Sequence, residues 1–252
     1  MVVKMTIIEI KDLNFSFKNK IIFEHLDLNF KDHTITTIMG ANGSGKSTLA
    51  HLIYDNYAGI SVNVDDIKLI TTNPCEQVIS KTVKEQLMFY LKQTNLDKEE
   101  IDKRVNKIIK DFELNDLISC DPYELDYATL QLIVVLSNII TYPELIIFDD
   151  AMTFISNYFK KKIFEILKKN KVSIINFTND SEECLYGSHV VILNKKVVLN
   201  KPLKSALKEE KVFLDNQIAL PFMAELSNKL KYYGLVDEII LDMDMMVKKI
   251  WS

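Results

Sequence analysis

The sequence predicts an α/β fold built around a largely parallel β-sheet. Short apolar stretches of strand length alternate with longer stretches whose apolar residues recur at helical spacing. The β-branched run Thr34–Met39 also ends at Gly40 and precedes the helical stretch Ser47–Tyr54, as expected for a buried parallel strand that leads into a helix. A chain of 252 residues accommodates one such domain with small appendages.

The N-terminal residues predict a small antiparallel sheet that precedes the parallel one. Thr6–Ile10 alternates between apolar and polar residues like a strand, and a second strand-like piece contains Phe15 and Phe17. Ile21–Phe30 has the pattern of a further strand. Strand patterns this close together in the chain are typical of β-hairpins.

Residues 74–142 contain no convincing strand pattern and predict a helical insertion between two strands of the sheet. Within the insertion, Asp97–Leu117 is expected to form a helix, because its apolar residues recur at helical spacing and its first turn is acidic. A second helix is expected over Ala128–Ile140.

The alternation of strand and helix patterns resumes after the insertion. The expected elements are, in order, the strand Leu145–Phe148, the helix Tyr158–Lys168, the strand Val172–Phe177, and a hairpin of Val190–Leu193 with Val197–Leu199. Amphipathic helical patterns follow from Leu220 and over Met243–Ile250. We therefore divide the chain into a main domain at residues 1–205 and a small helical C-terminal extension at residues 206–252.

Composition and charge narrow the possible functions. Hydrophobic residues make up 48% and charged residues 26% of the chain, which excludes a disordered protein. A net charge of −4 argues against a nucleic-acid-binding protein, including one that acts on DNA or ribosomes. The three cysteines fit no zinc or CxxC pattern and suggest a reducing compartment. We expect neither a signal peptide nor a membrane-spanning helix.

A glycine-rich motif between the strand at 34–39 and the helix at 47–54 predicts a phosphate-binding loop. Residues 40–47, Gly-Ala-Asn-Gly-Ser-Gly-Lys-Ser, fit the pattern GxxxxGK[ST] and contain half of the chain's six glycines. A chance glycine turn rarely has this strand–turn–helix context. Backbone N–H groups of such a loop surround a phosphate chain at the positive end of the helix. The residues expected to bind the nucleotide are Gly40, Asn42, Gly43, Ser44, Gly45, Lys46, Ser47 and Thr48.

Two residues of the loop and one strand end predict a site for Mg²⁺ and ATP. Lys46 is expected to reach the β- and γ-phosphates, and the Ser47 hydroxyl is expected to bind Mg²⁺. The strand at 145–148 ends on Asp149, and carboxyl ends of parallel strands are where ligands bind in open α/β sheets. By itself an Asp at this position could simply end a strand. Together with the Lys46 loop it indicates a metal ligand, so the predicted core is that of a P-loop NTPase.

With these motifs the sequence resembles the ATP-binding cassette (ABC) family, and more closely the ATPase subunits of energy-coupling factor (ECF) transporters. The opening strand resembles the family's, with Phe17 at the place of an aromatic that stacks on adenine, although Phe17 could instead be a core residue. The segment Asn73-Pro74 with Gln77, and the segment Asp121–Leu125, also resemble the family. Residues from Ala219 resemble the ECF extension that packs two ATPases together, although they could be an ordinary amphipathic cap.

The sequence departs from the family at the positions that the resemblance links to hydrolysis. The family's metal-sensing Gln is Thr72, which we still expect near the metal, and the catalytic Glu is Asp150, one methylene shorter. The switch His is Asn179, whose amide can contact a γ-phosphate but carries no proton or charge. The Asp after the catalytic strand is Ser156. We expect Lys46 and Asp150 to be the catalytic residues, with Asp150 a poorly placed base.

The signature motif departs furthest from the family. The family sequence LSGGQ is replaced by Leu-Asp-Tyr-Ala-Thr at residues 125–129. In the family this segment contacts the γ-phosphate held by the other subunit. Asp126 would place a negative charge against that phosphate, at a cost on the order of 1–4 kcal/mol, and Tyr127 would add bulk. A homodimer would then have two poor sites, so we expect a heterodimer with a second ABC ATPase.

The resemblance implies an ATP-binding subunit of an ECF-like importer. Its expected activity is ATP hydrolysis at a low intrinsic rate, coupled to uptake of a micronutrient through a polytopic membrane coupling subunit and a substrate-binding membrane subunit. Its expected location is the cytoplasmic face of the cell membrane, as a peripheral protein. Under this interpretation residues 1–205 are the nucleotide-binding domain and residues 206–252 are a dimerisation extension. The alternative is a non-catalytic nucleotide-binding partner in a heterodimeric pair of cassettes.

Overall fold

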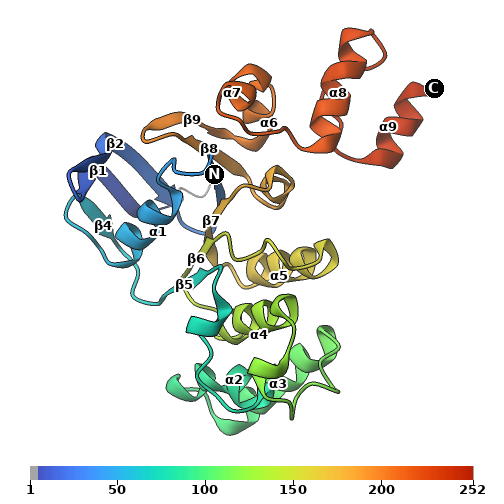
Figure 1. Ribbon diagram of the computed structural model, residues 1–252. Coiled ribbons are helices and arrows are strands. Elements are labelled where there is room, and N and C mark those ends of the chain that lie inside the picture. The colour runs from blue at the N-terminus through green and yellow to red at the C-terminus, as the bar shows by residue number, and fades with distance from the viewer. Residues whose placement is uncertain (1–4, 252) are drawn as a thin grey trace.

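A computed structural model describes residues 5–251, which form an α/β domain with two sheets (Figure 1). A three-stranded sheet has the order β2-β1-β4, and a six-stranded sheet has the order β5-β6-β7-β3-β8-β9. The predicted α/β class, with a mostly parallel sheet preceded by an antiparallel one, is confirmed.

The small sheet is antiparallel and forms from the N-terminal residues. Its strands are β1 (Thr6–Phe17), β2 (Lys20–Lys31) and β4 (Ile60–Val62). The prediction of two separate strand pieces before Ile21 was wrong. The chain instead passes through Asp12 with a left-handed backbone (φ 50°), which shifts the register between Ile10 and Leu13 without ending the strand.

The large sheet is parallel except at one edge. Its parallel strands are β3 (Ile35–Met39), β5 (Ile67–Thr71), β6 (Leu145–Asp149), β7 (Ser173–Thr178) and β8 (His189–Leu193). The last strand, β9 (Val197–Pro202), pairs antiparallel with β8 as the predicted hairpin. Every residue of β3, β6 and β7 is buried, which explains their nearly continuous β-branched and aromatic sequences.

Alternate residues of each central strand pack on opposite faces of the large sheet. Leu145 and Ile147 of β6 pack in one cluster with α1 (Lys46–Tyr54) and the small sheet. Ile146 and Phe148 pack in another with α5 (Asn157–Lys169) and α4 (Tyr127–Ile139). The side-chain period of two residues therefore places the large sheet between α1 with the small sheet and the pair α4 and α5 (Figure 1).

The elements between residues 74 and 142 are all helical, as the sequence predicted. They are η1 (Pro74–Glu76), α2 (Val83–Phe89), η2 (Leu91–Gln93), α3 (Lys98–Asp111), η3 (Pro122–Glu124) and α4. The prediction that one helix extends to Leu117 was wrong. Helix α3 ends at Asp111 because Glu113 adopts a left-handed backbone (φ 59°) and turns Leu114 into the core.

The C-terminal part lies beyond β9 and extends away from the sheet (Figure 1). It contains α6 (Leu203–Ala206), α7 (Glu210–Asp215), α8 (Phe222–Tyr232) and α9 (Met243–Ile250), whereas the short helix η4 (Ser181–Tyr186) lies between β7 and β8. Val236, Ile240 and Met246 form a separate small core between α8 and α9. Among residues 5–251, no helix has the length and apolar character needed to cross a bilayer.

The parallel arrangement brings four strand ends to one edge of the large sheet. Strand β3 ends before Gly40, β6 ends at Asp149, β7 ends before Asn179, and β5 ends before Thr72. In the parallel register Thr71 lies opposite Asp149, and Asp149 lies opposite Phe177. The polar residues that the sequence singled out therefore meet at the carboxyl edge of the sheet.

Candidate functional site

The loop between β3 and α1 requires glycine at two positions. A Cβ on Gly40 would lie 2.2 Å from the backbone oxygen of Leu193, so the loop passes too close to β8 for any side chain. Gly45 has φ 103°, and a Cβ there would lie 2.7 Å from the ring of Phe23 on β2. The aromatic ring of the small sheet thus supports the turn that begins α1.

The N-terminus of α1 lacks a side-chain cap. Its N-cap residue is Gly45, which cannot supply a hydrogen-bond acceptor, and no side chain in the described chain caps it. The N–H groups of the first turn of a helix have no partner within the helix and carry its positive partial charge. The end of α1 is therefore available to an anion, as the glycine-rich motif predicted.

Lys46 lies inside this loop and is only 6% exposed. Its ammonium donates to the backbone oxygen of Gly40 at 2.7 Å and to Oδ1 of Asn179 at 2.8 Å. Burial lowers the pKa of Lys46, although Asp150 and Asp149 partly oppose this shift. A buried cation with only neutral first neighbours is poorly compensated, and a bound phosphate would compensate it.

Ser47 and Asp149 form the expected pair of oxygen ligands. The Ser47 hydroxyl donates to Oδ1 of Asp149 at 3.0 Å. Burial raises the pKa of Asp149. The hydrogen bond from Ser47 opposes this shift but is the smaller effect. A hydroxyl and a carboxylate are the hard oxygen donors that suit Mg²⁺, which usually binds proteins through one or two such groups plus phosphates and water. The donor set therefore fits the predicted metal.

Asp150 has an unusual backbone and a constrained side chain. Its φ is 52°, in the left-handed region that favours glycine, and its Oδ1 accepts the backbone N–H of Asn179 at 3.2 Å. Burial raises the pKa of Asp150, Lys46 opposes this shift, and Asp149 adds to it. The Asp150 carboxylate is thus hydrogen-bonded to the residue that follows β7.

Asn179 connects three parts of the site. Its Oδ1 accepts from Lys46, its Nδ2 donates to Oδ1 of Asn42 at 3.0 Å, and its backbone N–H donates to Asp150. The structure thus brings together most of the predicted site: Asn42, Lys46, Ser47, Asp149, Asp150 and Asn179. Sequence reasoning gave Asn179 a contact with phosphate only and did not anticipate these links.

Thr72 lies one residue beyond β5 at the same edge of the sheet, and it is exposed. Its backbone oxygen accepts from the hydroxyl of Tyr127, and the backbone oxygen of Thr71 accepts from Nε2 of Gln131 at 3.1 Å. The start of the helical insertion is therefore bonded to α4 through its carbonyl groups. Whether the Thr72 hydroxyl reaches a metal stays a prediction.

Phe17 ends β1 at the turn into β2 and is 59% exposed. It is therefore outside the core, which removes one of the two interpretations left open by the sequence. The ammonium of Lys18 lies 5.4 Å from the centroid of its ring. An exposed aromatic face can accept a nucleobase, and its role in binding adenine stays a prediction.

The segment that replaces the signature motif is held by hydrogen bonds between its own residues. Asp126 is the N-cap of α4, where its Oδ1 accepts the backbone N–H of Thr129 at 3.0 Å and its Oδ2 accepts the Thr129 hydroxyl at 2.6 Å. These hydrogen bonds lower the pKa of Asp126, so the carboxylate stays charged. The ring of Tyr127 packs edge-on against Phe154 at 5.0 Å. The N-terminus of α4 is therefore capped by a carboxylate of the same chain.

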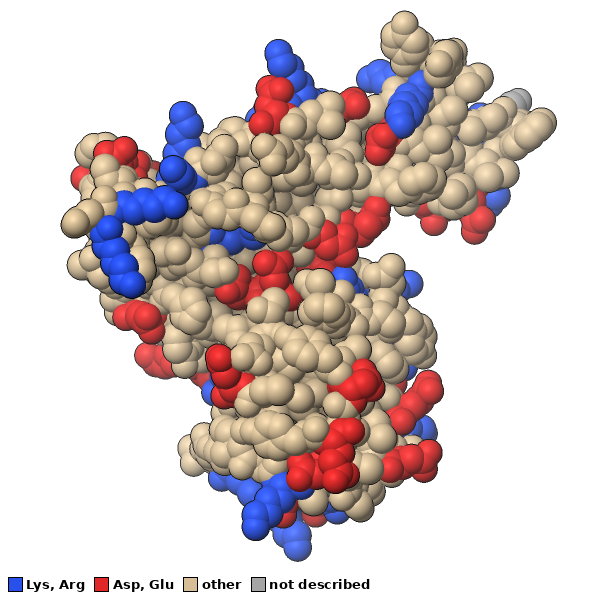
Figure 2. Space-filling view, in the orientation of Figure 1, with Lys and Arg blue, Asp and Glu red and all other residues tan. Residues whose placement is uncertain are grey.

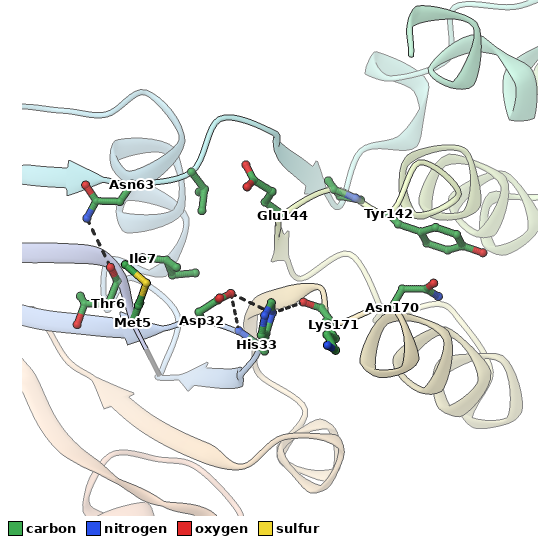
Figure 3. Close-up of a pocket in the computed structure, with 12 residues that line it drawn as sticks. Met5, Thr6, Ile7, Asp32, His33, Asn63, Tyr142, Glu144, Asn170 and Lys171 are labelled. Carbon is green, nitrogen blue, oxygen red and sulfur yellow. Dashed lines mark hydrogen bonds and ion pairs between the residues drawn. The ribbon is translucent and has the colours of Figure 1, made fainter. Parts of the chain in front are cut away.

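A cavity of about 430 Å³ lies at the opposite edge of the large sheet (Figure 3). Asp32, Glu144 and Lys171, which line it, precede β3, β6 and β7 respectively. The cavity is thus at the amino ends of the parallel strands, away from Lys46. Despite its size it is not the candidate nucleotide site, because Lys46, Ser47 and Asp149 lie at the carboxyl ends of the strands.

Acidic side chains are visible in the middle of the molecular face seen in Figure 2. The carboxylates that the contacts place at the carboxyl edge of the sheet beside Lys46 and Ser47 are Asp149 and Asp150. An anionic triphosphate would meet repulsion here unless a divalent cation came with it. The charge distribution is thus consistent with a magnesium–nucleotide complex.

Comparison with known proteins decides the family. The family model described as "ABC transporter" matches residues 23–153, which is more than half of the chain and includes the loop, the signature segment and Asp149. The chain belongs to the ABC transporter family. The match does not include Phe17 or the residues from Ala219, which the sequence analysis also used to propose the resemblance.

The relatives of this ABC protein include ATPases of ECF transporters. It is 28% identical over 262 residues to the energy-coupling factor transporter ATP-binding protein EcfA of Pediococcus pentosaceus, a match that covers 94% of each chain. It is 26% identical to EcfA1 of Fusobacterium nucleatum, covering 97% of this chain and 98% of the relative. The resemblance to ECF ATPases is confirmed over nearly the whole length.

Solved structures confirm the fold. CbiO1 of Clostridium perfringens, described as part of the ABC transporter complex cbiONQ, matches with a TM-score of 0.69 at 22% identity, over 88% of this chain and 99% of the other. An ATP-binding subunit of an ABC transporter matches with a TM-score of 0.74 at 18% identity, over 84% and 100%. The P-loop core and its antiparallel sheet are those of ABC ATPases.

Substituting two glycines of the loop tests its geometry. Both Gly43 and Gly45 have positive φ, so alanine is strained at either by about 1 kcal/mol. A Cβ at Gly43 meets nothing within 4 Å, whereas one at Gly45 overlaps the Phe23 ring. We expect Gly45→Ala to reduce the free energy of unfolding by about 1–3 kcal/mol more than Gly43→Ala in urea denaturation. Equal losses would contradict the proximity of Phe23.

Substituting Asp126 tests the self-capping of α4. Asp126→Ala removes the acceptor for the N–H of Thr129, so we expect a loss of about 1 kcal/mol in the free energy of unfolding. Asp126→Ser keeps a capping oxygen without the charge and should lie within about 0.5 kcal/mol of the parent chain. If the alanine variant is as stable as the serine variant, the cap is not formed in solution.

Proposed function

We propose that this protein is an ATP-binding subunit of an ECF-like ABC importer. It binds magnesium–ATP at Lys46, and closure and opening of a pair of cassettes is transmitted through the helical insertion to membrane subunits that take up a micronutrient. It is peripheral, on the cytoplasmic face of the cell membrane. The names of its relatives and their coverage of the whole chain support this assignment.

The open end of α1 is the observation that carries the proposal. An uncapped helix N-terminus, a buried lysine and a hydroxyl–carboxylate pair converge on one loop. Each of the three is unfavourable or incomplete alone, and a triphosphate with a divalent ion completes all three. Mg²⁺, when bound, supplies charge neutralisation and orients the phosphate oxygens.

The same geometry supports slow hydrolysis. A general base must lie within hydrogen-bond reach of the attacking water, and Asp150 is shorter than the glutamate it replaces and already bonded to Asn179. Nδ2 of Asn179 already donates one of its two hydrogens to Asn42, so only one remains for a phosphate. We expect ATP to bind well and to be hydrolysed weakly.

The capped end of α4 supports a heterodimer. In a symmetric pair, each P-loop would receive the Asp126 carboxylate of the other copy, so both sites would contain the same repulsion. A second ABC ATPase with an unblocked signature would complete the site at Lys46. Exposed apolar side chains on the extension, including Met245 and Trp251, are available for such a partner.

A non-catalytic role is the second candidate. In that case the protein holds ATP as a structural ligand in a pair whose partner performs hydrolysis. The hydrogen bond that Asn179 donates to the Asp150 carboxylate and the capped end of α4 favour this function. Both candidate functions use the same ATP-binding site and differ only in whether this chain hydrolyses ATP. Kinetic measurements of hydrolysis therefore separate them.

Calorimetry with magnesium–ATP tests binding. We expect saturable binding to the purified protein, weakened at least about 10-fold by Lys46→Ala, because a charge-assisted contact with phosphate is lost. Ser47→Ala should weaken binding only when Mg²⁺ is present, since its hydroxyl serves the metal. Lys171→Ala, at the opposite edge of the sheet, is the control and should bind like the parent chain. Absence of binding by the parent chain would overturn the proposed function.

Single-turnover hydrolysis tests catalysis. We expect a low rate for the protein alone, and an increase of about 10- to 100-fold for Asp150→Glu combined with Asn179→His in the presence of a partner ATPase. Asp150→Asn combined with Asn179→His is the matched control and should show no increase, because it restores the imidazole without a base. Rapid hydrolysis by the unmodified protein alone would contradict our account of Asp150.

A further inference from the structure

A buried ion pair lies beside the nucleotide site and takes no direct part in it. Lys160, on α5, is 2% exposed, and its ammonium lies 2.6 Å from Oε1 of Glu183, which is 1% exposed. The ammonium also lies 3.1 Å from Oδ2 of Asp180. Burial opposes the charge of Lys160, but Glu183 and Asp180 outweigh it and raise its pKa, so it remains an ammonium.

Lys160 occupies an apolar position of α5. The buried residues of this helix are Lys160, Ile163, Phe164 and Leu167, which recur at helical spacing on one face. A hydrophobic residue would fit this face, and replacing a buried ion pair by apolar residues is often neutral or stabilising. Stability alone therefore gives little reason for a charge here, and a positioning role explains it.

The hydrogen bonds of the two partners of Lys160 reach both sides of Asn179 along the chain. Before it, Nδ2 of Asn176 on β7 donates to Oε2 of Glu183 at 2.9 Å. After it, Oδ2 of Asp180 binds Lys160, while Oδ1 of Asp180 caps η4 through the N–H of Glu182 at 3.0 Å. The ammonium thus binds Asp180 directly after Asn179, and through Glu183 it is linked to Asn176 before Asn179.

The backbone of α5 connects Lys160 to the loop that follows Asp150, the expected catalytic residue. Helix α5 begins after Ser156, at the end of the short loop that follows Asp150, and Lys160 lies in its first turns. Asn179 in turn contacts Asp150, Lys46 and Asn42. Lys160 therefore joins the segment that carries Asp150 to the segment that carries Asn179.

We propose that Lys160 is a positioning residue of the nucleotide site, which holds Asp180 and Glu183 so that Asn179 stays in contact with Lys46, Asn42 and Asp150. This inference rests on the proposed function. It assigns to a side chain that touches no nucleotide the task of fixing the distance between β7 and the loop after β6. Without the ammonium, the segment 176–183 retains its strand but loses the bond that sets the direction of Asn179.

Three variants separate positioning from folding. Lys160→Met leaves two carboxylates without their cation. Lys160→Met with Glu183→Gln removes the buried charges, keeps an acceptor for Nδ2 of Asn176 and should recover stability. Lys160→Arg keeps a cation within reach of both carboxylates. Leu167→Ala, on the same face of α5 but away from Asp180, is the control for loss of packing.

The first readout is nucleotide affinity. We expect the double variant to bind magnesium–ATP about 10-fold more weakly than the parent chain, even at an unchanged melting temperature, because Asn179 is no longer held. Lys160→Arg should lie within about 3-fold of the parent chain, and Leu167→Ala should keep its affinity despite a lower melting temperature. If the stable double variant binds as tightly as the parent chain, the proposal is overturned.

The second readout needs no nucleotide. Backbone amide exchange at Asn179 and Asp180 should be at least about 10-fold faster in the double variant and unchanged in Leu167→Ala. If exchange at these amides does not change, Lys160 does not position the segment. If the parent chain binds no ATP but the exchange result holds, the proposed function fails while the structural role of Lys160 stands.

Discussion

The uncapped end of α1 is the constraint on which the rest of the site depends. A helix end needs partners for its free N–H groups, and here Gly45 supplies none. The loop can stay in this form because Gly40 allows contact with β8 and because Phe23 supports the turn. The small antiparallel sheet is therefore part of the site, since its aromatic ring holds the phosphate loop in the shape that leaves the N–H groups open.

The N-termini of α1 and α4 differ in their capping. This difference explains how one chain can be half of a nucleotide-binding pair. Helix α1 is left open, whereas α4 is closed by Asp126, whose carboxylate uses both oxygens on Thr129. An anion is attracted to the first and repelled by the second. Under the proposed function, the chain would bind phosphate in its own loop and would repel phosphate held in the loop of a partner, which is the physical basis for proposing unlike subunits.

Much of the fold could be predicted because its signals are local. The β-branched strand before Gly40 and the strand ending on Asp149 identify themselves by period and by motif. Strand β5, with Lys68 in its sequence, was missed because an edge strand needs no continuous apolar run. The end of α3 was missed because a left-handed Glu113 leaves no mark in the helical pattern. Contacts such as Asn179 with Asn42 join residues 137 positions apart and depend on the assembled sheet.

Lys160 is a residue whose burial could have been predicted from the sequence. Its position on the apolar face of α5, in register with Ile163, Phe164 and Leu167, marks a charge that must be paired inside the protein. Its partner could not be read from the pattern, since Glu183 and Asp180 belong to a short helix after β7. A buried charge on an otherwise apolar face is thus a pointer to a structural link. Under the proposed function, that link joins the two segments whose side chains would act together on a bound phosphate, and this is the ground for assigning its geometry to function more than to stability.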